Sequence, residues 1–251
     1  MLQLHRNSQV TFLRAPQLGE IPRIVHAFST RCGENDNFTM ELDRPDTWEN
    51  RERFMAAIGA PGWPSFVPKL IHSNLVHAID DNASLEDRPE GDAAFTSVSG
   101  IALGVSTADC APILLAESSC RMVAAIHAGW RGTSKGVVRH TVDQMVGKSG
   151  LDPGNLWAVI GPHIGVCCME VDEDVYNWFA EPELFEWRRE WTKPHLKLAE
   201  ANRRQLIEAG VDYYHVIVSS LCTKCRADLF YSHRKDGDRA GRMFSVIGIA
   251  P

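Results

Sequence analysis

Short apolar runs separated by polar or glycine-containing segments dominate the first two thirds of the chain and return near its end. Runs of four to eight apolar or β-branched residues bounded by turn-forming residues are typical of strands. They predict strands at residues 24–28, 93–96, 103–106, 113–116, 123–127, 157–160, 214–218 and 243–249.

Apolar positions spaced three or four residues apart indicate helices. They predict four helices, at residues 47–58, 134–146, 172–179 and 198–209. Because several predicted strands are joined by connections too short for a crossover helix, we expect an α+β fold. Its mixed and antiparallel sheets would carry the helices on the outside. No repeat or long linker divides the 251 residues, so we expect a single compact domain spanning residues 1–251.

Charge and composition narrow the class of protein. A formal net charge of −6 argues against a nucleic-acid binder but allows a small anionic ligand held by a few arginines. No apolar run reaches the roughly 18 residues that a membrane helix needs, and the N-terminus lacks the apolar core of a signal peptide. We therefore expect a cytoplasmic protein without membrane contacts, either a monomer or a small homo-oligomer.

Residues 113–116 and 123–127 flank a polar segment and predict a hairpin. With the turn centred between residues 118 and 119, Cys110 lies opposite His127, and both lie at the open end even if the turn shifts by a residue or two. A thiol and an imidazole there suit Zn²⁺. The same two residues could instead be a catalytic nucleophile and its base. They could also be a buried cysteine and a core histidine that are in contact without any catalytic or metal-binding role.

The segment Gly129-Trp130-Arg131-Gly132 follows directly, and Thr133 or Ser134 could cap the next helix. Free N–H groups at a helix start, together with the Arg131 guanidinium, predict an anion or phosphate site. The alternative is that Trp130 belongs to the core and that Arg131 pairs with an acid such as Asp109.

The other cysteines and histidines give weaker signals. The Cys222-x-x-Cys225 spacing is typical of a zinc ribbon or a redox motif, but a ribbon needs a second such pair, and the sequence has none. The adjacent Cys167 and Cys168 are not expected to share one tetrahedral ion easily. His72 ends an apolar run, and His77, five residues further on, is its competitor as a candidate ligand. A basic loop at residues 232–242 includes arginines that could reach an anion. The seven cysteines do not resemble a disulfide framework.

Several motifs occur in an order that identifies a family. Two of these motifs are T-A-D-C at residues 107–110 and H-A-G-W-R-G at residues 127–132. Further segments that match motifs of the same family lie along much of the chain, at residues 28–31, 49–51, 70–73, 92, 160–162, 167–171, 222–223 and 232–236. The chain therefore resembles the YfiH family, whose members are also called polyphenol oxidase, laccase-domain or purine nucleoside phosphorylase proteins. The resemblance implies a fold of the cytotoxic necrotising factor/YfiH type.

The resemblance also implies a zinc site made of His72, Cys110 and His127, with copper as an alternative metal. Three protein ligands leave a fourth position open, as in catalytic zinc sites. The implied catalytic residues are Cys110, His127, Asp109 and Arg131, and the implied substrate-binding residues are Arg31, Asp92 and Arg234.

The activity implied by the resemblance is phosphorolysis of adenosine, inosine and methylthioadenosine, with phosphate as co-substrate, together with deamination of adenosine. The alternatives are an amidase that edits peptidoglycan precursors, a metal-free Cys/His hydrolase and a polyphenol oxidase. A binding protein with a structural zinc is the non-enzymatic alternative. The sequence contains no G-x-G-x-x-G, no P-loop, no zinc deaminase signature and no H-x-H pair.

Overall fold

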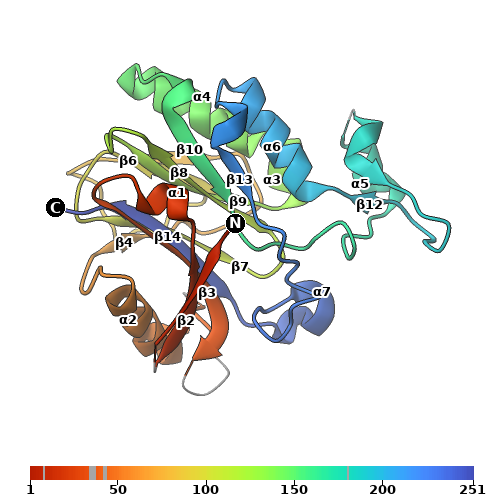
Figure 1. Cartoon of the computed structure of the whole chain (residues 1–251), viewed down its shortest axis with the longest axis horizontal. Helices are drawn as coiled ribbons and strands as arrows, with labels where there is room; N and C mark the ends of the chain where they lie inside the picture. The colour runs from red at the N-terminus through yellow and green to blue at the C-terminus, as the bar shows by residue number, and fades with distance from the viewer. Residues whose placement is uncertain (8, 34–37, 42–43, 180) are drawn as a thin grey trace.

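Two six-stranded sheets stack face to face, and helices cover both outer faces (Figure 1). The structure is a computed structural model that describes residues 1–7, 9–33, 38–41, 44–179 and 181–251. Mixed sheets with external helices confirm the predicted α+β class. None of the helices in the described part of the chain combines the length and apolar character needed to cross a bilayer.

The first sheet contains the N-terminal and C-terminal strands. Only its β4–β7 pair is parallel among the described strands; the other pairs are antiparallel. In spatial order its members are β1 (Gln3–Arg6), β2 (Val10–Arg14), β3 (Ile24–Gly33), β14 (Met243–Ile249), β7 (Ala102–Thr107) and β4 (Ser65–Phe66).

The second sheet is built around the predicted hairpin. Its two outermost pairs, β10–β13 and β5–β6, are parallel, and the pairs between them are antiparallel. In spatial order its members are β13 (Val216–Val218), β10 (Leu156–Ile160), β8 (Ala111–Glu117), β9 (Val123–Ala128), β6 (Ala93–Thr96) and β5 (Val76–Ile79).

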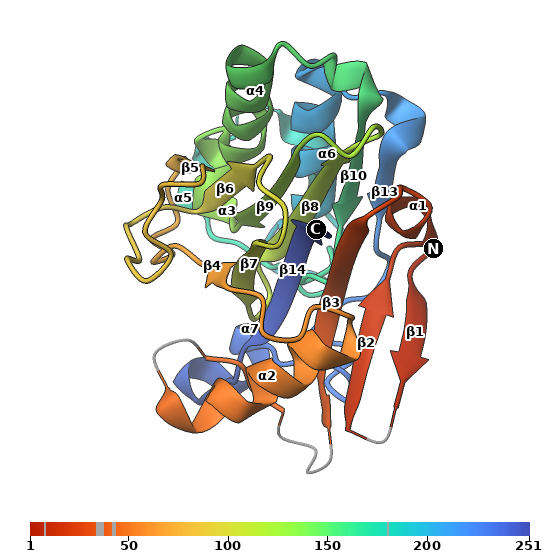
Figure 2. The same cartoon turned by 90° about the vertical axis from the view of Figure 1, so that its left-hand side faces the viewer.

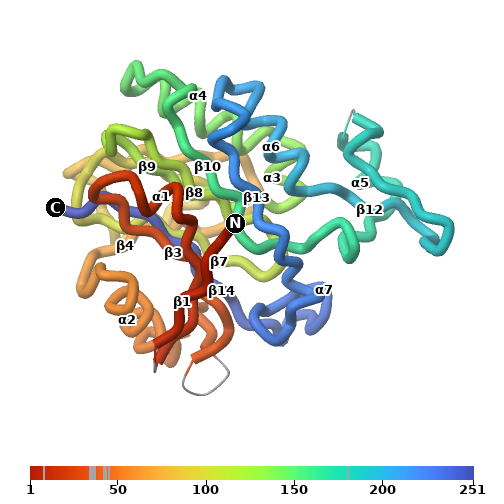
Figure 3. Tube along the Cα trace, in the orientation of Figure 1, coloured from red at the N-terminus to blue at the C-terminus, as the bar shows by residue number. Residues whose placement is uncertain are grey.

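The helices lie on opposite sides of this sandwich. Figure 2 shows α4 and α6 together on one side and α2 on the other. The segment that carries α5 and β12 projects from the edge of the sandwich (Figure 3). The α-helices are α1 (Pro16–Gly19), α2 (Trp48–Ala57), α3 (Trp130–Ser134), α4 (Val137–Ser149), α5 (Glu173–Asn177), α6 (Leu198–Glu208) and α7 (His233–Asp236). Short 3-10 turns are η1 (Pro45–Thr47), η2 (Pro153–Asn155), η3 (Pro182–Leu184), η4 (Tyr213–His215) and η5 (Gly237–Arg239), and β11 (Phe185–Glu186) pairs with β12 (His195–Leu196).

Three apolar layers hold the sandwich together. Leu103 and Leu114 belong to the layer between the two sheets. Phe54 of α2 packs on the outer face of the first sheet, and Leu206 of α6 packs on the outer face of the second. Both faces of β8 and β9 are therefore buried, which explains why these strands are continuous apolar runs rather than alternating ones.

The hairpin forms, but its register differs from the predicted one by two residues. Pro112, not Cys110, lies opposite His127. The turn closes where the Cys120 N–H donates to the Glu117 carbonyl, and Cys120 adopts a φ of 58°. A positive φ at a cysteine is uncommon, so the sequence offered no signal for this turn centre. Cys110 and His127 still lie at the same end of the hairpin.

Other predicted boundaries also change. The helix predicted at residues 134–146 is interrupted at its start: Ser134 ends α3, and α4 begins only at Val137, after Gly136 with a φ of 77°. Residues 214–218 begin as the 3-10 turn η4 and become a strand only at Val216. The short strands β1, β2, β4 and β5 were not predicted, since their polar neighbours obscure the apolar pattern.

The buried His26 predicts a pH dependence of stability. Its ring is 2% exposed, and its Nε2 accepts a hydrogen bond from the Ala15 N–H. Burial, reinforced by the charge of Arg14, lowers the pKa of His26 to about 3. As pH falls below about 6.5, the unfolded chain therefore binds a proton at this residue that the folded chain excludes. This difference costs about 2 kcal/mol of stability between pH 7 and pH 5.

His26→Gln should remove that part of the pH dependence, measured as urea-unfolding free energies at pH 7 and pH 5. His140→Gln, at an exposed position on α4, is the matched control. An equal loss of stability in the parent and in His26→Gln would contradict the assignment.

Candidate active site

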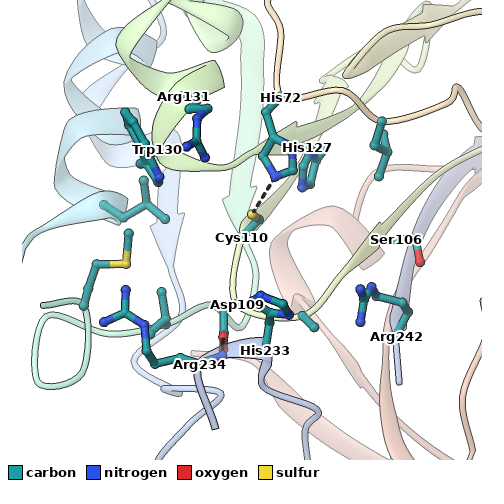
Figure 4. Close-up of a pocket in the computed structure, with 15 residues that line it drawn as sticks. His72, Ser106, Asp109, Cys110, His127, Trp130, Arg131, His233, Arg234 and Arg242 are labelled. Carbon is teal, nitrogen blue, oxygen red and sulfur yellow. Dashed lines mark hydrogen bonds between the residues drawn. The ribbon is translucent and has the colours of Figure 1, made fainter. Parts of the chain in front are cut away.

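His72, Cys110 and His127 meet at one point, from three separate parts of the chain (Figure 4). His72 lies in the loop before β5, Cys110 directly precedes β8, and His127 lies in β9. The His72 Nε2 and Cys110 Sγ atoms are 3.8 Å apart, and the two imidazole centroids are 4.9 Å apart. One ligand atom from each residue lies within 4.8 Å of the other two. Such a group could hold a metal ion.

The buried carboxylate of Asp92 fixes both histidines. It accepts hydrogen bonds from the His127 Nδ1 at 2.8 Å and from the backbone N–H groups of His72 and Ser73 at 3.0 and 2.5 Å. The Ser73 hydroxyl donates a further bond at 2.7 Å. Because Nδ1 of His127 is engaged, its Nε2 is left for a metal. His72 adopts a φ of 57°, which these bonds to Asp92 hold in place.

The same contacts determine the charge of the group. Burial raises the pKa of Asp92, but hydrogen bonds from His127 and Ser73 outweigh it and lower that pKa to about 2. Burial likewise opposes the thiolate of Cys110, yet the neighbouring His127 lowers the pKa of that thiol to about 6. Cys110 is therefore readily deprotonated, as a metal ligand or a nucleophile must be.

Gly129 leaves room for these ligands. A Cβ atom at residue 129 would lie 2.8 Å from the Cys110 sulfur and 2.9 Å from the His72 ring. The first glycine of H-A-G-W-R-G is thus explained by close approach of the backbone to the site.

The three side chains line a pocket of about 480 Å³. Pockets of this size take small organic ligands. Its other lining residues are Leu70, Ser106, Ala108, Asp109, Trp130, Arg131, Ile164, Met169, Leu198, His233, Arg234 and Arg242.

The predicted residues Arg131, Arg234 and Asp109 all line this pocket. Arg131 stacks on Trp130 with its guanidinium carbon 4.2 Å from the ring centroid. Asp109 accepts hydrogen bonds from the Thr223 and Ser232 hydroxyls and from the backbone N–H of Arg234. Its carboxylate therefore holds the C-terminal loop against the pocket.

Arg31 and Asp92 lie elsewhere. The Arg31 guanidinium stacks on Tyr231 and donates to the Ala227 carbonyl, and Arg31 is not among the residues lining the pocket. Asp92 accepts a hydrogen bond from the Nδ1 atom of His127 and is not among the residues that line the pocket. Substrate binding by these two residues stays a prediction.

Sequence reasoning missed part of the site. Trp130 and His233 line the pocket, although Trp130 was considered as a core residue and His233 was not singled out. The Cys222-x-x-Cys225 spacing alone does not predict a zinc ribbon, since the sequence has no second pair of that spacing. The structure brings the adjacent Cys167 and Cys168 to those residues. The second pair of cysteines is thus two adjacent residues, and a rule that looks for Cys-x-x-Cys spacing cannot detect it.

Comparison with known proteins identifies the family. Residues 27–250 match the family model described as multi-copper polyphenol oxidoreductase laccase. The chain belongs to this family. The resemblance inferred from the motifs is therefore confirmed.

Relatives in this family carry the names of purine-nucleoside enzymes. A purine nucleoside phosphorylase from Deinococcus radiodurans is 39% identical over 249 residues, which covers 94% of this chain and 92% of the relative. The purine nucleoside phosphorylase YlmD from Geobacillus stearothermophilus is 35% identical, over 82% and 80% of the two chains. The adenosine deaminase RL5, from an unknown prokaryote, is 34% identical over 72% of this chain and 73% of its own.

Solved structures agree with the fold. The crystal structure of YlmD from Geobacillus stearothermophilus superposes with a TM-score of 0.87, at 30% identity and 99% coverage of both chains. The structure of a Bacillus licheniformis YfiH protein gives the same TM-score at 26% identity, over 98% of both chains. The sandwich is therefore shared over nearly the full length.

The donor set fits a single metal ion. Two imidazoles and a thiol suit Zn²⁺, and a carboxylate that orients a ligating histidine is a frequent feature of zinc sites. Two histidines and a cysteine also occur in copper sites, so the donors alone do not select the metal. All three side chains line the pocket, so a metal ion held by them would face the space in which a substrate could bind.

Asp92→Asn should weaken zinc binding by roughly 10–100-fold, because the amide cannot accept every bond that now orients His72 and His127. Competition with a chromogenic chelator measures the affinity, and circular dichroism checks the fold. Glu90→Gln, an exposed carboxylate two residues away, is the matched control and should bind zinc like the parent. Unchanged affinity in folded Asp92→Asn would contradict the proposed role of Asp92.

Proposed function

We propose that this protein is a zinc-dependent purine nucleoside enzyme. It would cleave adenosine, inosine and methylthioadenosine with phosphate, and it would deaminate adenosine. The observation that carries the proposal is a pocket of about 480 Å³ in which an open His–Cys–His group and three arginines line the same space. The names of the relatives supply the substrate class.

The pocket lining suits both parts of a nucleoside-plus-phosphate complex. Leu70, Ile164, Met169 and Leu198 offer apolar surface to a purine. Arginines 131, 234 and 242 offer charged donors, and guanidinium groups pair well with phosphate. In Figure 4, Arg131 lies above Cys110 and Arg234 lies below it, and both arginines line the pocket with the three-ligand group.

The two reactions place different demands on this site. In phosphorolysis a phosphate oxygen bonds to C1′ of the ribose, the C1′–N9 bond breaks, and the departing purine takes a proton. In deamination a water oxygen bonds to C6 of adenine and ammonia leaves. Zn²⁺ held by His72, Cys110 and His127 would supply Lewis acidity. The arginines would hold the phosphate that only phosphorolysis needs, and Asp92 would keep His127 oriented.

A polyphenol oxidase with several coppers has less support. Multi-copper centres draw on more imidazoles than one pair of histidines provides. Within the described part of the chain, the other group of three or more adjacent metal-ligating side chains consists of four cysteines. Copper in the His–Cys–His site itself stays an alternative to zinc.

A metal-free thiol hydrolase is the second candidate, because one observation favours it. Cys110, His127 and Asp92 follow one another like the nucleophile, base and orienting acid of a catalytic triad. Such an enzyme could include an amidase acting on peptidoglycan precursors. His72 has no role in that triad, which separates the two candidates.

His72→Ala should abolish zinc binding and lower kcat/KM for nucleoside turnover by about 100-fold or more, since loss of the metal removes several kcal/mol of transition-state stabilisation. Product release from adenosine, inosine and methylthioadenosine is followed by chromatography, with His140→Ala as the surface control. Full activity of zinc-free His72→Ala, together with loss of activity on alkylation of Cys110, would contradict the zinc requirement and favour a metal-free mechanism with Cys110 as nucleophile.

Arg131→Gln should separate the two reactions. Losing a charged donor to phosphate should raise KM for phosphate by about 10–100-fold in phosphorolysis. Adenosine deamination, which uses no phosphate, should keep its kcat within about twofold of the parent value. Arg139→Gln on the exposed face of α4 is the matched control. An equal loss in both reactions would show that Arg131 does not act through phosphate.

A further inference from the structure

A second cluster of sulfur atoms lies outside the residues that line the pocket. Cys167 and Cys168 come from the loop after β10, and Cys222 and Cys225 come from the loop after β13. The Cys225 sulfur is 3.6 Å from that of Cys167 and 3.5 Å from that of Cys168. All four sulfur atoms lie within 4.8 Å of one another. Two turns separated by more than fifty residues of sequence thus converge on one point.

The spacing of these atoms matches a tetrahedral metal site. Zinc–thiolate bonds of about 2.3 Å place the sulfur atoms of a regular tetrahedron about 3.8 Å apart. A disulfide requires about 2.05 Å, and all four cysteines are free thiols. The distances to Cys225 therefore fit four ligands around one ion, with small adjustments, and do not fit a bonded pair.

The backbone around the cluster is shaped for this approach. A Cβ atom at Gly165 would lie 3.1 Å from the Cys222 Cβ and 3.3 Å from the Cys167 sulfur, so a side chain there would crowd the cluster. The Cys168 N–H donates to the Gly165 carbonyl. One turn therefore presents two adjacent cysteines to the same point.

We propose that Cys167, Cys168, Cys222 and Cys225 bind a second zinc ion, separate from the His72–Cys110–His127 site. Four thiolates complete a tetrahedron and leave no open position, which is the pattern of a structural rather than a catalytic zinc. Cys167 and Cys225 are exposed, so the ion can enter from solvent. The site is independent of the substrate proposed for the pocket.

The ion would fasten two walls of the pocket to each other. The first loop contributes Ile164 and Met169 to the lining, and the second leads into His233 and Arg234. Between them there is little regular structure, apart from an isolated bridge joining His163 and Cys222. A metal cross-link at this point would hold the walls at a fixed separation. Its role would be to position these walls, not to contact substrate.

Metal content measured by mass spectrometry on protein expressed with zinc tests the proposal. We expect two zinc ions per parent chain, one in Cys225→Ser, one in Cys110→Ser and none in the double variant. Cys32→Ser, a free thiol outside both clusters, is the control and should keep two. Cobalt substitution of Cys110→Ser should give the intense thiolate-to-metal absorption of a four-sulfur site, and the double variant should lose that absorption.

One zinc ion per parent chain that persists in Cys225→Ser would overturn the proposal. So would an intact mass, measured without reductant, that is lower than the fully reduced chain by two or four hydrogens through disulfides among these cysteines. Cys167→Ser, at an exposed position, is the second variant should Cys225→Ser fail to fold. We expect either variant to melt roughly 10 °C lower than Cys32→Ser. Because metal content needs no turnover, the result does not depend on the proposed activity.

Discussion

The candidate active site depends on one buried carboxylate. Asp92 is fully buried, and an unpaired charge in that position would be strongly destabilising. Its oxygens instead accept bonds from the His127 ring, the Ser73 hydroxyl and the backbone of residues 72 and 73. The loop before β5 is thereby tied to β9, and the unusual backbone conformation of His72 is stabilised. Without this interaction, His72 and His127 would lose their common orientation.

The sequence predicted the interior strands well because both of their faces are buried. Residues 93–96 and 243–249 form strands with the predicted bounds, since continuous apolar runs need no knowledge of the partner strand. Register is a different matter. It depends on which turn closes the β8–β9 hairpin, and that choice rests on a left-handed Cys120 that no propensity favours. An error of one residue in the turn centre shifted every pair in the hairpin by two residues.

For the candidate active site too, local patterns in the sequence predicted some contacts and missed those that depend on distant segments. Cys110 and His127 could be placed together because one hairpin contains both. His72 came from the family resemblance alone, since it reaches the site through Asp92 from a distant loop. The four-cysteine cluster was beyond sequence reasoning, because its two turns meet only when β10 and β13 pair in parallel. Local spacing finds contacts within one supersecondary unit, whereas contacts between units need the topology.

The charge of the pocket also depends on local structure rather than on composition. A chain with net charge −6 has no long-range attraction for phosphate, and at physiological salt charges are screened beyond about 8 Å. The arginines must therefore act at close range. α3 carries Arg131, which lines the same pocket as His72, Cys110 and His127, while the hydrogen bonds to Asp109 fix the backbone at Arg234. Those bonds also engage Asp109, the one carboxylate among the described residues that line the pocket, which would otherwise repel an anion. Selectivity for an anionic co-substrate would then arise from these few contacts.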